Sequence, residues 1–288
     1  MQSLRETIKN GGEKKVALGH FNISDSVALQ AIFDAARELG LPVIIGASEG
    51  ERSFLGTTQV AAMVEGLRKA YDYPIYLNAD HTHSLESAVA AARAGYDAVL
   101  FDAGKLAWGD NLAKTAEVVK AIREINPEII VEGEIGYIGG SSKVLEAVPE
   151  GAAVKPEDLT TPQQAREFVE TTGVDLLAPA VGNLHGMFKN AANPRLDIGR
   201  IRAIGESAGV PLVLHGGSGI VDDDFRSAIS VGIRIVHINT EIRLAWRRGM
   251  ESGLAGDKNE VAPYKIAESA LADIKEVVLS RLRLFGGI

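Results

Sequence analysis

The sequence has no cysteine, no long hydrophobic run and no excess of basic residues. Without thiolates, any metal ion must be held by histidine and carboxylate, a donor set that suits zinc or another divalent ion. No apolar stretch approaches membrane-spanning length, and the N-terminal residues lack a signal-peptide core, so we expect a cytoplasmic protein with no membrane partner. The formal net charge of −8 argues against a nucleic-acid partner, because a surface that tracks phosphates needs excess lysine and arginine.

What the chain of 288 residues does contain is a regular alternation of short apolar runs and amphipathic segments. The apolar runs have the length and continuity of buried strands. The expected strands are residues 16–22, 42–46, 75–80, 98–102, 129–134, 176–180, 211–214 and 235–239. The expected helices are residues 3–10, 26–39, 58–70, 84–94, 111–125, 162–171, 198–208, 222–231, 241–252 and 262–284.

Strands that are apolar throughout indicate a parallel sheet that is buried on both faces. Eight strand–helix units in one chain of this length favour a closed (β/α)8 barrel, the TIM barrel. An open doubly wound sheet is less favoured, because no strand–turn–helix carries the G-x-G-x-x-G pattern. Since no linker interrupts the chain, residues 1–288 are predicted to form a single domain with a helical C-terminal tail.

Polar residues at the predicted strand ends are the candidate functional residues, because a barrel of this kind builds its active site at the carboxyl ends of its strands. Three of the six histidines follow strands three, six and seven. The polar residues at these ends are Asn22, Ser48, Asp80, His81, His83, Asp102, Glu132, Glu134, Asn183, His185, His215, Asn239, Thr240 and Glu241.

The three strand-end histidines, His81, His185 and His215, predict a metal site. Three neutral imidazoles with an open fourth position are typical of catalytic zinc. Glu134 is either a further ligand or a partner of a ligand. Adjacent residues of a strand point to opposite sides, so Asp80, next to His81, is expected to face away from it and to be free to act as an acid or a base.

A phosphate site is predicted beside this centre. His215 is followed at once by Gly216, Gly217, Ser218 and Gly219, and bare backbone N–H groups of such a turn can bind an anion. Loops after strands seven and eight form the usual phosphate site of the barrel, which adds Asn239 and Thr240. Lys189 is either a further point charge for the phosphate or a solvated loop lysine, and the turn itself could instead serve only to end a strand.

In combination, the strand-end motifs resemble those of the class II, metal-dependent ketose-bisphosphate aldolases, which act on fructose or tagatose bisphosphate. The resemblance extends from residue 4 to residue 285. The stretches that carry it are Gly19-His20-Phe21-Asn22, Ala47-Ser48-Glu49-Gly50, Ala79-Asp80-His81, Phe101-Asp102, Glu132-Gly133-Glu134-Ile135-Gly136, Gly182-Asn183-Leu184-His185-Gly186, Leu214-His215-Gly216-Gly217-Ser218-Gly219 and Asn239-Thr240-Glu241.

The resemblance implies a role for each candidate residue. His81, His185 and His215 would bind zinc, Glu134 would serve a more buried metal position, and Asp80 would be the catalytic acid/base. It also implies a monovalent cation (Na⁺ or K⁺) near the backbone of residues 181, 186 and 216, and a homodimer or homotetramer. The residues expected to contact the sugar or its phosphates are Asn22, Ser48, Gly186, Lys189, Gly216, Ser218, Asn239, Thr240 and, for a second phosphate, Arg243.

The implied reaction is the cleavage of a ketose 1,6-bisphosphate to dihydroxyacetone phosphate and an aldehyde. Breaking the carbon–carbon bond leaves a carbanion beside a ketone, which spreads onto the ketone oxygen as an enediolate stabilised by the metal ion. Asp80 would take the proton from the other hydroxyl. The sequence leaves open whether the sugar is of the fructose or the tagatose type, and whether the metal is zinc.

Three positions depart from the family pattern. Asn78 replaces a histidine two residues before the aspartate, Ser141-Ser142 replaces a pair that contains a glutamate base, and His237 replaces an asparagine. Glu146 or Glu150 could substitute for the base, or both could be solvated loop charges. His237 could be a neutral hydrogen-bond donor or a charge. The alternative to an aldolase is therefore a non-catalytic or altered-substrate member that binds a sugar phosphate.

Overall fold

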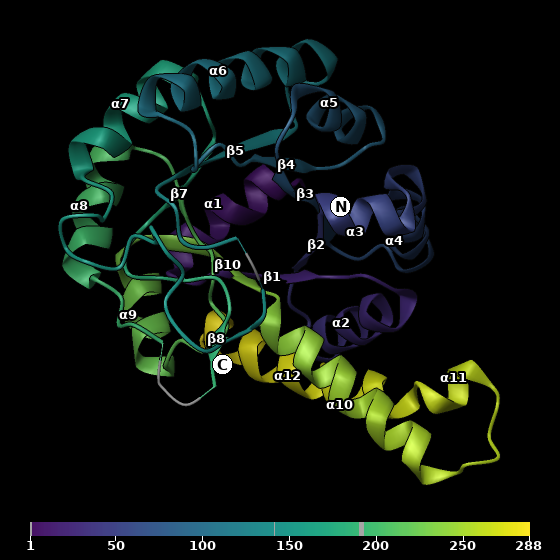
Figure 1. Ribbon diagram of the computed structural model, residues 1–288. Helices are drawn as coiled ribbons and strands as arrows, with labels where there is room; N and C mark the ends of the chain where they lie inside the picture. The colour runs from purple at the N-terminus through teal and green to yellow at the C-terminus, as the bar shows by residue number, and fades with distance from the viewer. Residues whose placement is uncertain (1, 141, 190–192) are drawn as a thin grey trace.

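A computed structural model of the protein describes residues 2–140, 142–189 and 193–288. Eight parallel strands close into a barrel in the spatial order β1-β10-β9-β7-β5-β4-β3-β2 (Figure 1), which confirms the predicted (β/α)8 fold. The barrel strands are β1 (Leu18–Asn22), β2 (Val43–Ser48), β3 (Ile75–Thr82), β4 (Ala98–Phe101), β5 (Ile130–Ile135), β7 (Leu176–Pro179), β9 (Leu212–Leu214) and β10 (Ile233–Ile238).

Most of the helices surround the barrel on the outside (Figure 1). In the order of elements, most helices come next after a strand, and the short α3 lies between β2 and α4. The helices are α1 (Leu4–Lys14), α2 (Ser26–Leu39), α3 (Glu49–Leu55), α4 (Thr57–Tyr71), α5 (Leu85–Arg93), α6 (Trp108–Ile125), α7 (Pro162–Thr172), α8 (Ile198–Ala208), α9 (Asp222–Val231), α10 (Thr240–Gly256), α11 (Pro263–Ile266) and α12 (Glu268–Gly286).

The inside of the barrel has an apolar half and a polar half. Its apolar half is a separate buried cluster, closed by α1 through Leu4 and Ile8. Tyr76 reaches the same helix, with its hydroxyl 2.6 Å from Oγ1 of Thr7. Because successive strand residues alternate sides, the residues two and four places further along each strand also point inward. These are largely histidine, asparagine and carboxylate, so the polar half lies toward the carboxyl ends of the strands.

The C-terminal helices form an arm that extends away from the barrel, with α10 and α12 side by side and α11 at the far end (Figure 1). Two glycines allow this close approach: a Cβ at Gly249 would lie 2.3 Å from Cα of Ala270, and one at Gly253 would lie 2.0 Å from the carbonyl oxygen of Ile266. The rest of α12 packs on the barrel, where Ala17 N donates to Phe285 O. The predicted single domain over the whole chain stays a prediction.

Three elements were not expected from the sequence. Helix α3 has only seven residues and no apolar stripe, and it starts through a capping box in which Ser48 and Glu51 satisfy each other's backbone. Strands β6 (Val144–Leu145) and β8 (Met187–Phe188) form a separate parallel pair, in segments that look like loops because each strand is two residues long. None of the helices in the described ranges is both long enough and apolar enough to cross a membrane.

Tyr73 provides a test of the packing between α2 and the barrel. Its hydroxyl donates to the carbonyl oxygens of Ala36, at 2.6 Å, and Leu41, at 2.8 Å, and burial raises its pKa to about 12. The folded state therefore favours the neutral phenol, and this stabilisation is complete below pH ~10 and lost as the pH rises toward 12.

We predict that Tyr73→Phe lowers the free energy of unfolding by about 1 kcal/mol at neutral pH. The difference between the two proteins should narrow as the pH is raised from ~10 to ~12, as measured by urea denaturation at each pH. Tyr96, whose pKa burial also raises to about 12, is present in both proteins and cancels. A difference that does not change with pH would contradict the assignment.

Candidate metal centre and active site

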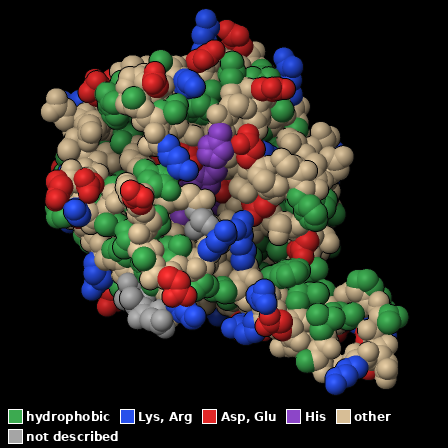
Figure 2. All heavy atoms as spheres, in the orientation of Figure 1, with side chains coloured by type: hydrophobic (Ala, Val, Ile, Leu, Met, Phe, Trp, Pro, Cys, Tyr) green, Lys and Arg blue, Asp and Glu red, His purple; other side chains and the backbone are tan. Residues whose placement is uncertain are grey.

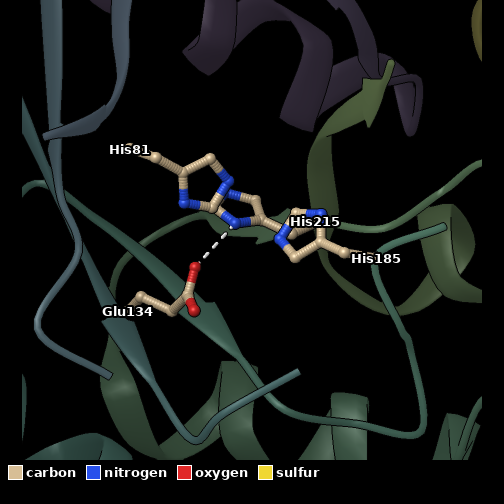
Figure 3. A group of neighbouring side chains, drawn as sticks. All are labelled: His81, Glu134, His185 and His215. Atoms are coloured by element: carbon tan, nitrogen blue, oxygen red, sulfur yellow. Dashed lines mark hydrogen bonds and ion pairs between the residues drawn. The ribbon is translucent and has the colours of Figure 1, made fainter. Parts of the chain in front are cut away.

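Four side chains at the polar end of the barrel converge on one point. His81, Glu134, His185 and His215 each direct one ligand atom into a space in which all four atoms lie within 4.8 Å of one another (Figure 3). They come from the end of β3, the end of β5 and the segments that follow β7 and β9. The structure thus brings together the three histidines and the glutamate that the sequence selected.

Carboxylates fix the orientation of two of these rings. Nε2 of His215 lies 2.7 Å from Glu132, and its Nδ1 lies 2.8 Å from Glu134. Nδ1 of His81 lies 2.8 Å from Asp102. A carboxylate bonded to one ring nitrogen, with the other nitrogen directed at the ligand cluster, is the arrangement by which proteins orient metal-binding histidines.

The raised pKa values of His81 and His215 reflect the negative charge of the carboxylates around this centre. Burial opposes protonation of His81, but the charge of Asp80 and the hydrogen bond that the ring donates to Asp102 raise its pKa to about 9. Glu132 and Glu134 likewise outweigh burial and raise the pKa of His215 well above its ordinary value. The buried carboxylates therefore need positive charge nearby, which protons supply here and a divalent ion would supply in their place.

His185 is the third ring of the cluster and has different surroundings. Burial, together with the charges of His81 and His215, holds its pKa well below the ordinary value, so this ring is neutral. Its Nε2 is buried and has no hydrogen-bond partner among the described residues. A buried nitrogen lone pair without a partner is costly and is suited to a metal ion. The four donors therefore fit a divalent cation.

Asp80 lies beside the cluster and on the same side as His81, which corrects the expectation that the two would face apart. Oδ1 of Asp80 is 3.9 Å from Nε2 of His81, and both residues line the same cavity. The cause is a break in the β3–β4 register between Ala79 and Thr82, where His81 adopts a φ of 39°. A bulge of this kind re-aims a side chain that regular alternation would direct elsewhere.

The surroundings of Asp80 keep it ionised. Burial raises its pKa, but the histidines His81, His237 and His20 outweigh this and lower the pKa well below its usual value. The side-chain amide of Asn22 donates to Oδ2 at 2.8 Å. Nδ1 of His237 lies 3.3 Å from Oδ1. Asp80 is thus a buried carboxylate that Asn22 holds on one side and His237 approaches on the other, with a protonation state suited to accepting a proton.

Two of the three departures from the family pattern meet inside the barrel. His237 stacks on His20, its neighbour in the β1–β10 register, with ring centroids 3.5 Å apart and planes 2° from parallel. Asn78 contacts Nε2 of His20 at 3.1 Å. Burial lowers the pKa of His20 to about 4 and that of His237 well below its ordinary value. Of the alternatives for His237, the lowered pKa therefore favours the neutral imidazole.

The predicted phosphate residues gather in one pocket beside Asp80, His81 and His185. Gly216 has a φ of 60°, and a Cβ there would lie 2.3 Å from the carbonyl oxygen of Leu184, so only glycine fits. Thr240 begins the 17-residue helix α10, and the N-terminus of a helix favours an anion. Lining the pocket are Asn22, Gly186, Gly216, Ser218, Asn239 and Thr240.

Sequence reasoning missed Asn193, which ties together the two loops that are predicted to bind phosphate. Its side-chain amide donates to the carbonyl oxygens of Gly186 and Ser218, each at 3.0 Å. No strand-end pattern indicates such a residue, because it belongs to the long segment after β8. By contrast, Lys189 is not among the residues that line the pocket. Its ammonium lies 3.5 Å from Glu146, and both side chains are exposed.

Arg243 lines the cavity, but its charge is already compensated. Its guanidinium lies 2.8 Å from the carboxylate of Glu51, which also accepts from Asn22 and from the backbone N–H of Ser48. Arg243 also donates to the carbonyl oxygen of Ser142 at 3.3 Å. Ser48 lines the same cavity and caps α3. The other serine of the departing pair, Ser141, lies outside the described residues.

These groups surround a cavity of about 390 Å³. Figure 2 shows histidine side chains at the bottom of an opening in this face, with acidic and basic side chains around the rim. Lys105 and Tyr137 line the cavity without having been selected from the sequence, although Lys105 follows a strand end just as the selected residues do. The ammonium of Lys105 lies 5.0 Å from the centre of the Tyr137 ring.

Known proteins resemble this chain over nearly its whole length. The family model described as fructose-bisphosphate aldolase class-II matches residues 2–288. The chain is 36% identical over 287 residues to the probable fructose-bisphosphate aldolase of Bacillus subtilis (strain 168), covering 99% of this chain and 97% of that protein. It is 35% identical to the fructose-bisphosphate aldolase of Staphylococcus aureus (strain N315), covering 99% and 96%.

Among solved structures, the crystal structure of the YdjI aldolase from Escherichia coli K12 is similar, with a TM-score of 0.83, 29% identity, and coverage of 99% of this chain and 97% of that one. The chain therefore belongs to the class II fructose-bisphosphate aldolase family, whose members are carbon–carbon lyases. Enzymes of this family generally depend on a metal ion and act on sugar phosphates.

The packing of the stacked His20 ring against Gly46 predicts that a methyl group added at Gly46 lowers the stability of the protein. A Cβ at Gly46 would lie 2.1 Å from Cε1 of His20, so Gly46→Ala should displace His20 and lower the free energy of unfolding by about 2 kcal/mol through overpacking. Gly66→Ala in α4, where a Cβ meets nothing within 4 Å, is the matched control and should be neutral or slightly stabilising. Equal stability of the two variants in urea denaturation would contradict the packing described.

Proposed function

We propose that the protein is a zinc-dependent aldolase that cleaves a ketose 1,6-bisphosphate, of the fructose or tagatose type, to dihydroxyacetone phosphate and an aldehyde. The observation that supports it most directly is the ionised Asp80 next to a cluster of three histidines and Glu134. A base and a cation-binding cluster that share one cavity are what a retro-aldol reaction requires.

The proposed substrate lies along the cavity with its 1-phosphate at the pocket formed after β7, β9 and β10. The turn at Gly216 and the start of α10 support this orientation through backbone N–H groups. A Na⁺ or K⁺ ion near the backbone oxygens of Val181, Gly186 and Gly216 would offset the phosphate charge. The proposed phosphate contacts are Gly186, Gly216, Ser218, Asn239 and Thr240, while Lys189, paired with Glu146, has less support.

In the proposed reaction Asp80 accepts the proton of the substrate hydroxyl whose carbon becomes the aldehyde as the carbon–carbon bond breaks. The electron pair of that bond stays on the triose phosphate as an enediolate. His81, His185 and His215, with Glu134 as an alternative ligand, would hold a divalent ion, and this ion would supply Lewis-acid stabilisation of that charge. Asn22 and His237 hold Asp80 in place, and in the synthetic direction Asp80 returns the proton.

A second candidate is a lyase of altered substrate, favoured by one observation. Because Arg243 pairs with Glu51 at 2.8 Å, little of its charge is left for a second phosphate. A substrate with less negative charge at the end remote from the 1-phosphate would suit such a cavity. The oligomeric state and the cytoplasmic location expected from the sequence stay predictions.

The first prediction for this function concerns metal and substrate. Purified protein loaded with Zn²⁺ should release triose phosphate from fructose 1,6-bisphosphate or tagatose 1,6-bisphosphate in a coupled assay, and chelation should abolish the activity until Zn²⁺ is restored. Each bisphosphate is compared with the corresponding ketose 1-phosphate. A preference for the monophosphate would favour the altered-substrate lyase, and binding without any cleavage would favour a non-catalytic member.

The second prediction concerns Asp80. Asp80→Asn keeps the hydrogen bond from Asn22 but removes the base, so kcat should fall by ~10²- to 10⁴-fold. The affinity for dihydroxyacetone phosphate, measured by calorimetry, should change little, because the proposed phosphate contacts lie on other strands. A variant that keeps substantial turnover would show that another group accepts the proton.

A further inference from the structure

Arg52 is a buried charge directly behind the active site. It lies on α3 with only 3% of its surface exposed, and no carboxylate among the described residues forms a salt bridge with it. Its guanidinium donates instead to neutral oxygens. These are the backbone oxygens of Ala47 and Asp80, the latter at 3.0 Å, and the hydroxyls of Thr82, at 2.9 Å, and Ser87, at 3.4 Å.

These four oxygens belong to three elements of the chain, β2, β3 and α5. Ala47 is near the end of β2, Asp80 and Thr82 are at the end of β3, and Ser87 is in the first turn of α5. The planar fork of an arginine can hold several acceptors at fixed angles, which a lysine cannot. Arg52 therefore fixes the end of β3 relative to both of its neighbours in the chain.

His81 lies between the two β3 residues that Arg52 holds. Its φ of 39° is unfavourable for a residue other than glycine, and such a conformation persists only where the surrounding contacts enforce it. The bonds from Arg52 to the Asp80 carbonyl and the Thr82 hydroxyl are contacts of this kind. Without them β3 is free to return to regular alternation, in which Asp80 and His81 face opposite sides.

We propose that Arg52 is a positioning residue that holds the β3 bulge, so that the acid/base Asp80 and the metal ligand His81 face the same cavity. The inference rests on the proposed metal site and deepens it, because it assigns part of the metal affinity to a residue that touches neither metal nor substrate. The buried guanidinium also places a positive charge behind the Asp80 carboxylate.

The test measures metal affinity directly as well as turnover. Arg52→Met keeps an unbranched stem about as long as the aliphatic part of the arginine, but it removes the charge and all four hydrogen bonds. It should weaken Zn²⁺ binding, measured by competition with a chelating dye, by ~10- to 100-fold. It should also lower kcat by a similar factor with little change in KM, and alter the visible spectrum of the Co²⁺-substituted protein. Arg52→Lys should give an intermediate loss.

Arg68→Met is the matched control. Arg68 braces the opposite end of the same strand, where it donates to Ile75 O and pairs with Asp97. Its loss should lower the melting temperature but leave Zn²⁺ affinity unchanged. If Arg52→Met does not fold, Thr82→Val, which removes one acceptor of the guanidinium, provides the test and should weaken Zn²⁺ binding in the same direction.

Two results would overturn the proposal: wild-type Zn²⁺ affinity and Co²⁺ spectrum in Arg52→Met, or an equal loss of affinity in Arg52→Met and Arg68→Met. Wild-type Zn²⁺ affinity in Thr82→Val would overturn it if Arg52→Met cannot be studied. His81→Ala separates this failure from that of the proposed function. If His81→Ala binds Zn²⁺ as the wild type does, the metal site itself is wrong, whatever Arg52 does.

Discussion

The candidate active site depends on hydrogen bonds between carboxylates and histidine rings inside the barrel. Glu132 and Glu134 hold His215 from both sides, and Asp102 holds His81. A buried carboxylate or imidazolium alone is strongly unfavourable, so each is tolerated only because the other is within reach. The same hydrogen bonds orient the rings toward one point. The pairing that makes burial tolerable therefore also produces the geometry of a candidate cation site.

The apolar half of the barrel interior contributes to stability, and the polar half carries the candidate site. The apolar half, closed by α1, stabilises the fold through dense packing, with Tyr76 linked to Thr7 at its edge. The polar half contains histidine, asparagine and carboxylate side chains, which weaken a core and are expected where a protein carries out a reaction. Between them, the stacked rings of His20 and His237 fill space as apolar residues would, while His237 still contacts Asp80.

The catalytic face is held by residues that do not themselves belong to it. Helix α3 contributes Glu51, which joins Asn22, Ser48 and Arg243, and Arg52, which joins β2, β3 and α5. Asn193 joins the two loops of the proposed phosphate pocket. Glu51, Arg52 and Asn193 each use one planar group to connect several segments of the chain. These connections hold the residues around the cavity of about 390 Å³ in fixed positions.

The sequence by itself determined the barrel and the meeting of His81, His185, His215 and Glu134. Apolar continuity and residue spacing are local properties that define parallel strands, and closing those strands brings their ends together. Tertiary structure alone decided that Asp80 turns to the side of His81, that Glu51 compensates Arg243 and that Lys189 pairs with Glu146. These outcomes depend on a register break and on contacts between residues as many as 192 positions apart, which no local pattern in the sequence encodes.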